Sequence, residues 1–129
     1  MSENFNWMTS MLQGTGRLVG TPSIDGNIMS AEVKALEGRT QLVFIMEGDD
    51  YWLFASPFAK TGQINGDQAL DVLNAVDMAA GVRKFGDYYS LVRFLDKGDI
   101  QADEIVKALA RVALWADAVE SALGHGDAL

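Results

Sequence analysis

The chain has 129 residues, of which 49% are hydrophobic and 22% are charged. This composition is typical of a globular domain and excludes a disordered chain, and the length predicts one domain over residues 1–129. Its 18 acidic and 10 basic side chains give a formal net charge of -8, which counts against nucleic acid and anionic membrane surfaces as partners.

Cysteine is absent, which excludes disulfides, thiolate catalysis and cysteine-based metal sites. Residues 1–6 are polar and acidic, unlike the basic and then apolar start of a signal peptide. No apolar run approaches the length of about 18 residues that a transmembrane helix needs. We therefore expect no membrane segment and a cytoplasmic location.

The first half of the chain predicts one helix and then a β-rich segment. Apolar residues recur at helical spacing until Gly14, so a short helix is expected over residues 4–13. Short apolar runs separated by Asp-Gly, Glu-Gly and Gly-Asp turns follow, and they predict an antiparallel meander. Its three or four strands are expected at residues 17–21, 28–35, 39–47 and 51–56.

The second half predicts a helix, a hairpin and a long helix. A helix is expected over residues 67–78, and strands at 81–84 and 88–95 turn at Gly86-Asp87. The last helix carries one apolar stripe, formed by Ile105, Leu109, Val112, Ala116, Val119 and Leu123. The order α-β-β-β(-β)-α-β-β-α predicts an α+β fold with two layers and an antiparallel sheet.

The alternation of side chains along the strands predicts two faces of this sheet. An even-numbered loop after residue 46 brings one apolar row together, made of Leu42, Phe44, Met46, Tyr51, Leu53 and Ala55. An even-numbered loop over residues 36–39 adds to that row the side chains of Met29, Ala31, Val33 and Ala35. We take this face as the core face.

The opposite face has polar margins and an apolar centre formed by Val43, Ile45, Trp52 and Phe54. Burying these four side chains would contribute about 6–10 kcal/mol, so the patch needs a cover. The sequence leaves two alternatives for this cover. Either the helix at 67–78 covers it within one chain, through Leu70, Leu73 and Val76, or a second copy or a client segment does. In the second case the four residues are the partner-binding site.

The chain offers no constellation for catalysis. His125 is the single histidine and lies between two glycines near the C-terminus, and no serine has a nucleophile-elbow or lysine motif beside it. We therefore expect that the protein is not an enzyme and that it has no cofactor and no metal site. Tyr88, Tyr89 and Phe94 have too few basic neighbours for base stacking, so a structural role is assigned to them.

The element order resembles the YbjN family, within the wider group of folds shared with class I type III secretion chaperones. The likeness covers residues 4–124, and the segments that carry it are QLVFIMEGDDYWLFASP, ALDVLNAV, GVRKFGDYYSLVRFL and DEIVKALARVALWADAVESAL. The resemblance implies a type III secretion chaperone-like fold without catalytic residues. For secretion chaperones it implies a homodimer that holds an extended client segment on its sheet surfaces.

Under the same resemblance, Leu70, Leu73 and Val76 correspond to the dimer interface of the chaperones if this protein dimerises in the same way. YbjN-like proteins look instead like stress or regulatory factors, and the chain is closer to that branch. The favoured function is therefore a non-enzymatic, chaperone-like or regulatory module that binds a partner protein. The alternative is a small-molecule or ion-binding domain, with or without enzymatic activity, that uses a cavity between the helices and the sheet.

Overall fold

The computed structural model describes residues 3–35, 38–75, 80–98 and 102–123. Within these residues the chain forms three helices, α1 (Glu3–Gly14), α2 (Gly66–Ala75) and α3 (Ala102–Ala122). Six strands accompany them, β1 (Leu18–Asp25), β2 (Ile28–Lys34), β3 (Thr40–Glu47), β4 (Tyr51–Lys60), β5 (Gly81–Phe85) and β6 (Tyr88–Asp96). The order α-β-β-β-β-α-β-β-α confirms the predicted α+β fold.

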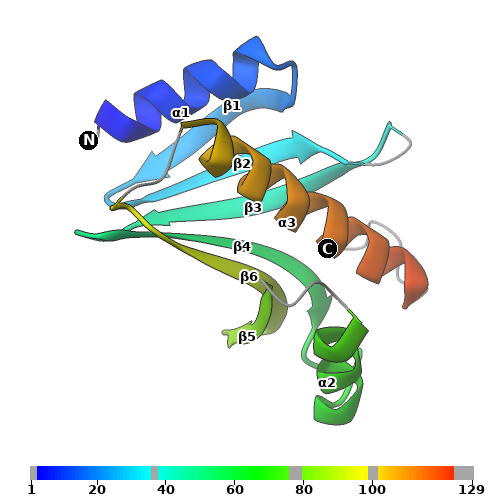
Figure 1. The fold of residues 1–129 in the computed structure, drawn as a ribbon. Helices are drawn as coiled ribbons and strands as arrows, with labels where there is room; N and C mark the ends of the chain where they lie inside the picture. The colour runs from blue at the N-terminus through cyan, green and yellow to red at the C-terminus, as the bar shows by residue number, and fades with distance from the viewer. Residues whose placement is uncertain (1–2, 36–37, 76–79, 99–101, 124–129) are drawn as a thin grey trace.

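All six strands belong to one antiparallel sheet with the order β1-β2-β3-β4-β6-β5 (Figure 1). The first four strands form the predicted meander, and β6 pairs with β4, so β5 lies at an edge. Two hairpins close through two residues each, between the pairs Asp25–Ile28 and Phe85–Tyr88. Gly26 (φ 61°) and Gly86 (φ 56°) supply the positive φ that such turns require.

Strand β1 is longer than the sequence predicts, because Pro22 does not end it. Its pairing with β2 shifts between Val19 and Ser23, so Pro22 lies at an irregularity of the ladder. β1 is the other edge strand of the sheet, and an edge strand is where the missing N–H of a proline is tolerated.

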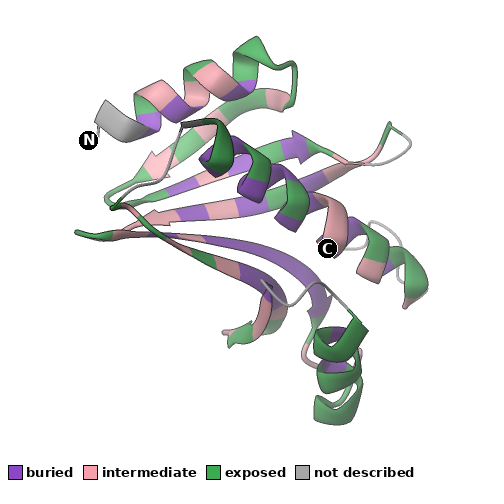
Figure 2. Ribbon diagram, in the orientation of Figure 1, coloured by how far each residue is buried: buried purple, intermediate pink, exposed green. Residues whose placement is uncertain are grey.

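The helices pack against one side of the sheet and make the second layer (Figures 1 and 2). The larger core cluster joins α1 and α3 to β2, β3 and β4, and among its buried side chains are Phe5, Met8, Leu12, Leu109, Val112, Met29, Val43, Ile45, Trp52 and Phe54. A second cluster joins α2 to the C-terminal half of α3, and it contains Phe58, Ile64, Ala69, Val72, Leu91 and Ala116.

The predicted register between β2 and β3 is wrong by one residue, and this exchanges the two faces of the sheet. Lys34 pairs with Thr40, which leaves residues 35–39 between them, an odd number. Met29 therefore lies opposite Ile45 and Ala31 opposite Val43, on the helix side. Because side chains alternate with a period of two, a slip of one residue turns a whole row to the other face.

An ion pair joins the start of β3 to the last turns of α3. The Arg39 guanidinium donates through Nε to both carboxylate oxygens of Asp117, at 2.9 and 3.0 Å, and through a terminal nitrogen to one of them at 2.9 Å. The Asp117 side chain is buried, whereas that of Arg39 is partly exposed. This bidentate contact fixes α3 over the sheet at the end where β2 and β3 connect.

Asp117→Ala tests how much this ion pair contributes to the stability of the fold. The substitution removes the hydrogen bonds between the buried carboxylate and the partly exposed Arg39 guanidinium, so we expect the free energy of unfolding to fall by about 2 kcal/mol. Urea denaturation followed by circular dichroism measures the loss. Lys107→Ala removes the exposed 3.7 Å pair with Asp103 and should change stability by about 0.5 kcal/mol at most. Equal losses in the two variants would contradict the assignment.

Ile45→Ala and Leu42→Ala test the register of β3, because the two residues differ in face but lose the same number of carbon atoms. Ile45 is fully buried and Leu42 is 38% exposed. We expect a loss of about 3 kcal/mol for Ile45→Ala and less than about 1 kcal/mol for Leu42→Ala. Denaturation curves of both variants decide, and the reverse ranking would restore the register predicted from the sequence.

Candidate functional site: the helix-free face of the sheet

The face of the sheet opposite α1 and α3 carries an apolar surface, here called the helix-free face. The register places on it one row from each of four strands, with Phe44 opposite Ala55, Met46 opposite Leu53, and Leu53 opposite Phe94. Within the described ranges no helix packs against these rows. The surface is defined by Ile28, Leu42, Phe44, Met46, Leu53, Ala55, Pro57, Tyr88, Val92 and Phe94.

Several large side chains of this face remain in contact with water. Phe94 is 61% exposed, and Ile28, Leu42 and Tyr88 are also exposed. The Tyr51 ring stacks on Phe94 with 5.2 Å between centroids and 22° between planes, which holds Phe94 in place without covering it. Phe44, Met46 and Leu53 are half-buried, whereas Ala55, Pro57 and Val92 are buried. A group of exposed apolar side chains of this kind is typical of an interaction site.

The helix-free face is hollowed at its centre. A cavity of about 310 Å³, here called the apolar hollow, is lined by Ile28, Phe44, Met46, Ala55, Pro57, Phe85, Tyr88 and Ser90. A neighbouring cavity of about 410 Å³, here called the β3–β4 cavity, is lined by Glu32, Thr40, Gln41, Leu42, Phe44, Pro57, Tyr88 and Glu120. The two share Phe44, Pro57 and Tyr88, so they lie side by side.

The β3–β4 cavity exists because its two strands separate. Their pairing runs from Glu47–Trp52 to Phe44–Ala55, and beyond that point β4 bends away from β3 toward α2 (Figure 1). Side chains bridge the opening instead of a backbone ladder. The Ser56 hydroxyl donates to the Leu42 carbonyl at 2.6 Å, and the Gln41 amide donates to the Pro57 carbonyl at 2.7 Å.

The floor of the β3–β4 cavity is polar and buried. The Gln41 amide also donates to Oε1 of Glu120 on α3, at 3.3 Å, and both residues are buried. The opening between the strands therefore leads from the apolar surface to a carboxylate on the helix layer. Gln41 holds this carboxylate in position from the sheet side.

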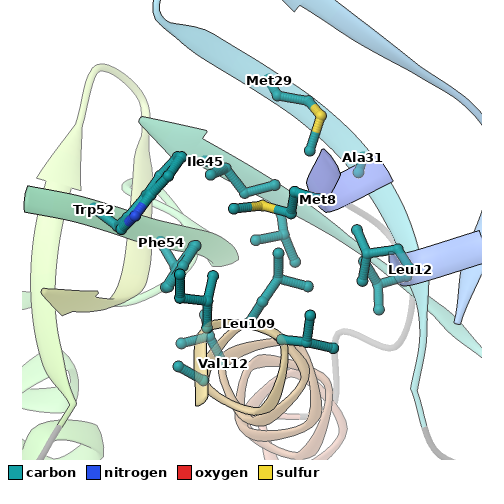
Figure 3. Close-up of a cluster of buried hydrophobic side chains, with 14 of the residues drawn as sticks. Met8, Leu12, Met29, Ala31, Ile45, Trp52, Phe54, Leu109 and Val112 are labelled. Carbon is teal, nitrogen blue, oxygen red and sulfur yellow. The ribbon is translucent and has the colours of Figure 1, made fainter. Parts of the chain in front are cut away.

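The partner-binding residues predicted from the sequence lie in the core and not on a surface. Val43, Ile45, Trp52 and Phe54 are buried between the sheet and the helices α1 and α3, beside Met8, Leu109 and Val112 (Figure 3). Of the two predicted covers, a cover within the same chain is present, but α1 and α3 provide it in place of the helix at 67–78. A partner that contacted these four side chains would have to displace both helices.

The predicted dimer residues lie away from that patch. Leu70 and Leu73 on α2 are 58% and 37% exposed, and they line a cavity of about 460 Å³ together with Val82 and Tyr89 of the β5–β6 hairpin. Val76 and His125 lie outside the described residues.

Sequence reasoning missed the surface that the structure exposes. It grouped Leu42, Phe44, Met46 and Leu53 correctly as one row, but it placed that row in the core because the loop parity was wrong. Phe94 was assigned a structural role. Side chains alternate along a strand, so Phe94 lies on the face opposite to Arg93 and Leu95. That alternation was the available signal.

Other chemistry finds little support in the described parts of the chain. Histidine and acidic side chains there form no group of three or more that could hold a metal ion. Between α3 and β6, a cavity of about 110 Å³ is lined mainly by the charged residues Arg93, Glu104, Lys107 and Arg111, and it is smaller than either cavity of the helix-free face. No helix in these ranges combines the length and apolar character that a membrane span needs.

Comparison of the chain with protein-family models, with curated proteins and with solved structures finds no match.

Proposed function

We propose that this protein is a non-enzymatic protein-binding module, chaperone-like or regulatory, whose partner docks on the helix-free face of the sheet. The single observation that carries the proposal is the set of exposed and half-buried apolar side chains on this face, from Ile28 to Phe94, which the described helices leave uncovered. A partner protein would remove this surface from water.

The composition of the surface suits a protein interface. Phe44, Met46, Tyr88 and Phe94 belong to the aromatic and methionine classes that are enriched at the centre of interfaces. Each large apolar side chain that becomes fully buried contributes about 1.5–3 kcal/mol, less in proportion for those already half-buried. Glu32, Lys34 and Arg83 stand on the same face nearer its margins, which is the arrangement of a polar rim.

The surface is built on paired strands and needs no folding step to form. The rows on β3, β4 and β6 are held by backbone ladders, by side-chain hydrogen bonds where β3 and β4 separate, and by the core beneath them. A site that is ordered before binding loses little conformational entropy in the complex. This favours a preformed docking surface over one that folds on the partner.

The proposal agrees with the resemblance to the YbjN family and the secretion chaperones, which implies binding of a protein segment on the sheet. It also agrees with the net charge of -8, which disfavours phosphate backbones as partners. We place the protein and its partner in the cytoplasm.

Met46→Lys tests the proposed function. The substitution puts a charge at the centre of the helix-free face while the core beneath keeps Ile45. We expect Met46→Lys to capture at least about tenfold less of the proteins that the wild-type chain captures from the native cell extract. This ratio corresponds to about 1.4 kcal/mol of binding free energy. Capture followed by quantitative mass spectrometry measures the ratio.

Gln13→Lys is the matched control, because it makes the same change of charge at an exposed position of α1. It should retain the partners of the wild-type chain. Equal capture by all three chains would contradict partner binding by the helix-free face, provided that circular dichroism shows each of them folded.

The exposed leucines of α2 are the proposed dimer surface. If two copies meet through Leu70 and Leu73, the double substitution Leu70→Glu and Leu73→Glu should convert a dimer to a monomer without unfolding it, because both side chains already contact water. Light scattering on a gel-filtration column measures the mass. A wild-type monomer at high protein concentration would contradict this part of the proposal.

A further inference from the structure

Strand β6 carries an arginine on the face of the sheet that packs against the helices. The register places Arg93 opposite Phe54, which is buried between the sheet and the helices. β6 is also an interior strand, because it pairs with β4 on one side and with β5 on the other. Such a position usually holds an apolar residue, so a half-buried arginine there needs a compensating group.

Helix α3 brings two more basic side chains to the same place. Its residues Glu104, Lys107, Ala108 and Arg111 follow one another at helical spacing, so they share one side of the helix, next to the apolar stripe. Together with Arg93 and Leu95 they line the cavity of about 110 Å³ between α3 and β6, here called the α3–β6 cavity. Of the four charged groups in this lining, three are basic.

The carboxylates of the protein do not balance this positive charge. In the parts of the chain that the structure describes, no carboxylate forms an ion pair with Arg93 or Arg111. Lys107 has only an exposed pair with Asp103, at 3.7 Å, and it lies four residues from Arg111, a spacing at which like charges destabilise a helix. The lining is therefore positive in a protein whose formal net charge is -8.

We propose that the α3–β6 cavity binds a phosphate group, either as the free ion or as the end of a small phosphomonoester. Guanidinium groups donate paired hydrogen bonds to phosphate oxygens, and Arg93 and Arg111 supply one such group from the sheet and one from the helix. The Lys107 ammonium adds a third donor. A bound dianion relieves the repulsion among the three basic groups.

The size and the position of the cavity define the ligand further. A volume of about 110 Å³ is well below the roughly 300 Å³ at which pockets for drug-sized molecules begin, so the cavity encloses a phosphate group and leaves the rest of a larger molecule outside. The cavity lies on the helix side of the sheet, opposite to the helix-free face. The inference is therefore independent of the proposed function.

Isothermal titration calorimetry of the full chain with inorganic phosphate tests the inference. At constant ionic strength we expect saturable binding with a Kd of about 1 mM or below. Chloride at the same ionic strength should give no saturable signal, because it offers no oxygen pair to a guanidinium group. Phosphoserine identifies the source of the group: tighter binding than that of inorganic phosphate assigns the site to a phosphomonoester, and weaker binding assigns it to the free ion.

Single substitutions in the cavity should shift the affinity for phosphate in opposite directions. Arg93→Gln and Arg111→Gln each remove charge-assisted hydrogen bonds, so each should weaken binding about tenfold or more. Glu104→Gln removes the negative charge of the lining and should strengthen binding about threefold. Lys60→Gln is the matched control, because it makes the same change of charge as the arginine variants at an exposed position at the end of β4, and it should bind like the wild type.

Two results would overturn the inference. One is the absence of saturable phosphate binding by the wild-type chain, and the other is an equal loss in Lys60→Gln and Arg111→Gln, which would reduce the effect to overall charge. If Arg93→Gln does not fold, Arg111→Gln decides, because Arg111 is exposed on α3. Met46→Lys should keep the wild-type affinity for phosphate, so failure of this inference and failure of the proposed function are distinguishable.

Discussion

The packing of α1 and α3 on one face of the sheet is the constraint on which the rest of the structure depends. Trp52, Phe54, Ile45 and Val43 point into that layer, so every second residue of β3 and β4 is committed to the core. The alternate residues are turned the other way by the period of the strand. The same strand register therefore produces both the buried core face and the apolar face without helices. The ion pair between Arg39 and Asp117 helps to keep α3 in position over the core face.

Much of the fold followed from the sequence because its signals are local. Two-residue turns at Asp25–Ile28 and Phe85–Tyr88 and the long apolar stripe of α3 identify elements without reference to distant parts of the chain. The site did not follow, because it depends on the parity of a single loop. Residues 35–39 contain no hydrophobic pattern that distinguishes an odd loop from an even one, and that difference decided whether Met46 or Ile45 faces the helices.

The β3–β4 cavity was also beyond reach of sequence reasoning. It requires Gln41, Ser56 and Glu120 to meet from a strand, a second strand and a helix, across 79 positions of the chain in the case of Gln41 and Glu120. Each of these residues alone has the appearance of an ordinary polar position. Only the three-dimensional arrangement shows that Gln41 and Ser56 join the two strands where the ladder ends.

Pro57 contributes to the separation of β3 and β4 through its backbone. In a strand, the nitrogen and the carbonyl of one residue point to the same neighbour, and the Pro57 carbonyl accepts the Gln41 amide from the β3 side. The missing N–H of proline is therefore missing toward β3, where a closing ladder would need a donor. A ladder that continued past this residue would lack one hydrogen bond, so the backbone itself favours the separation of the two strands at this point.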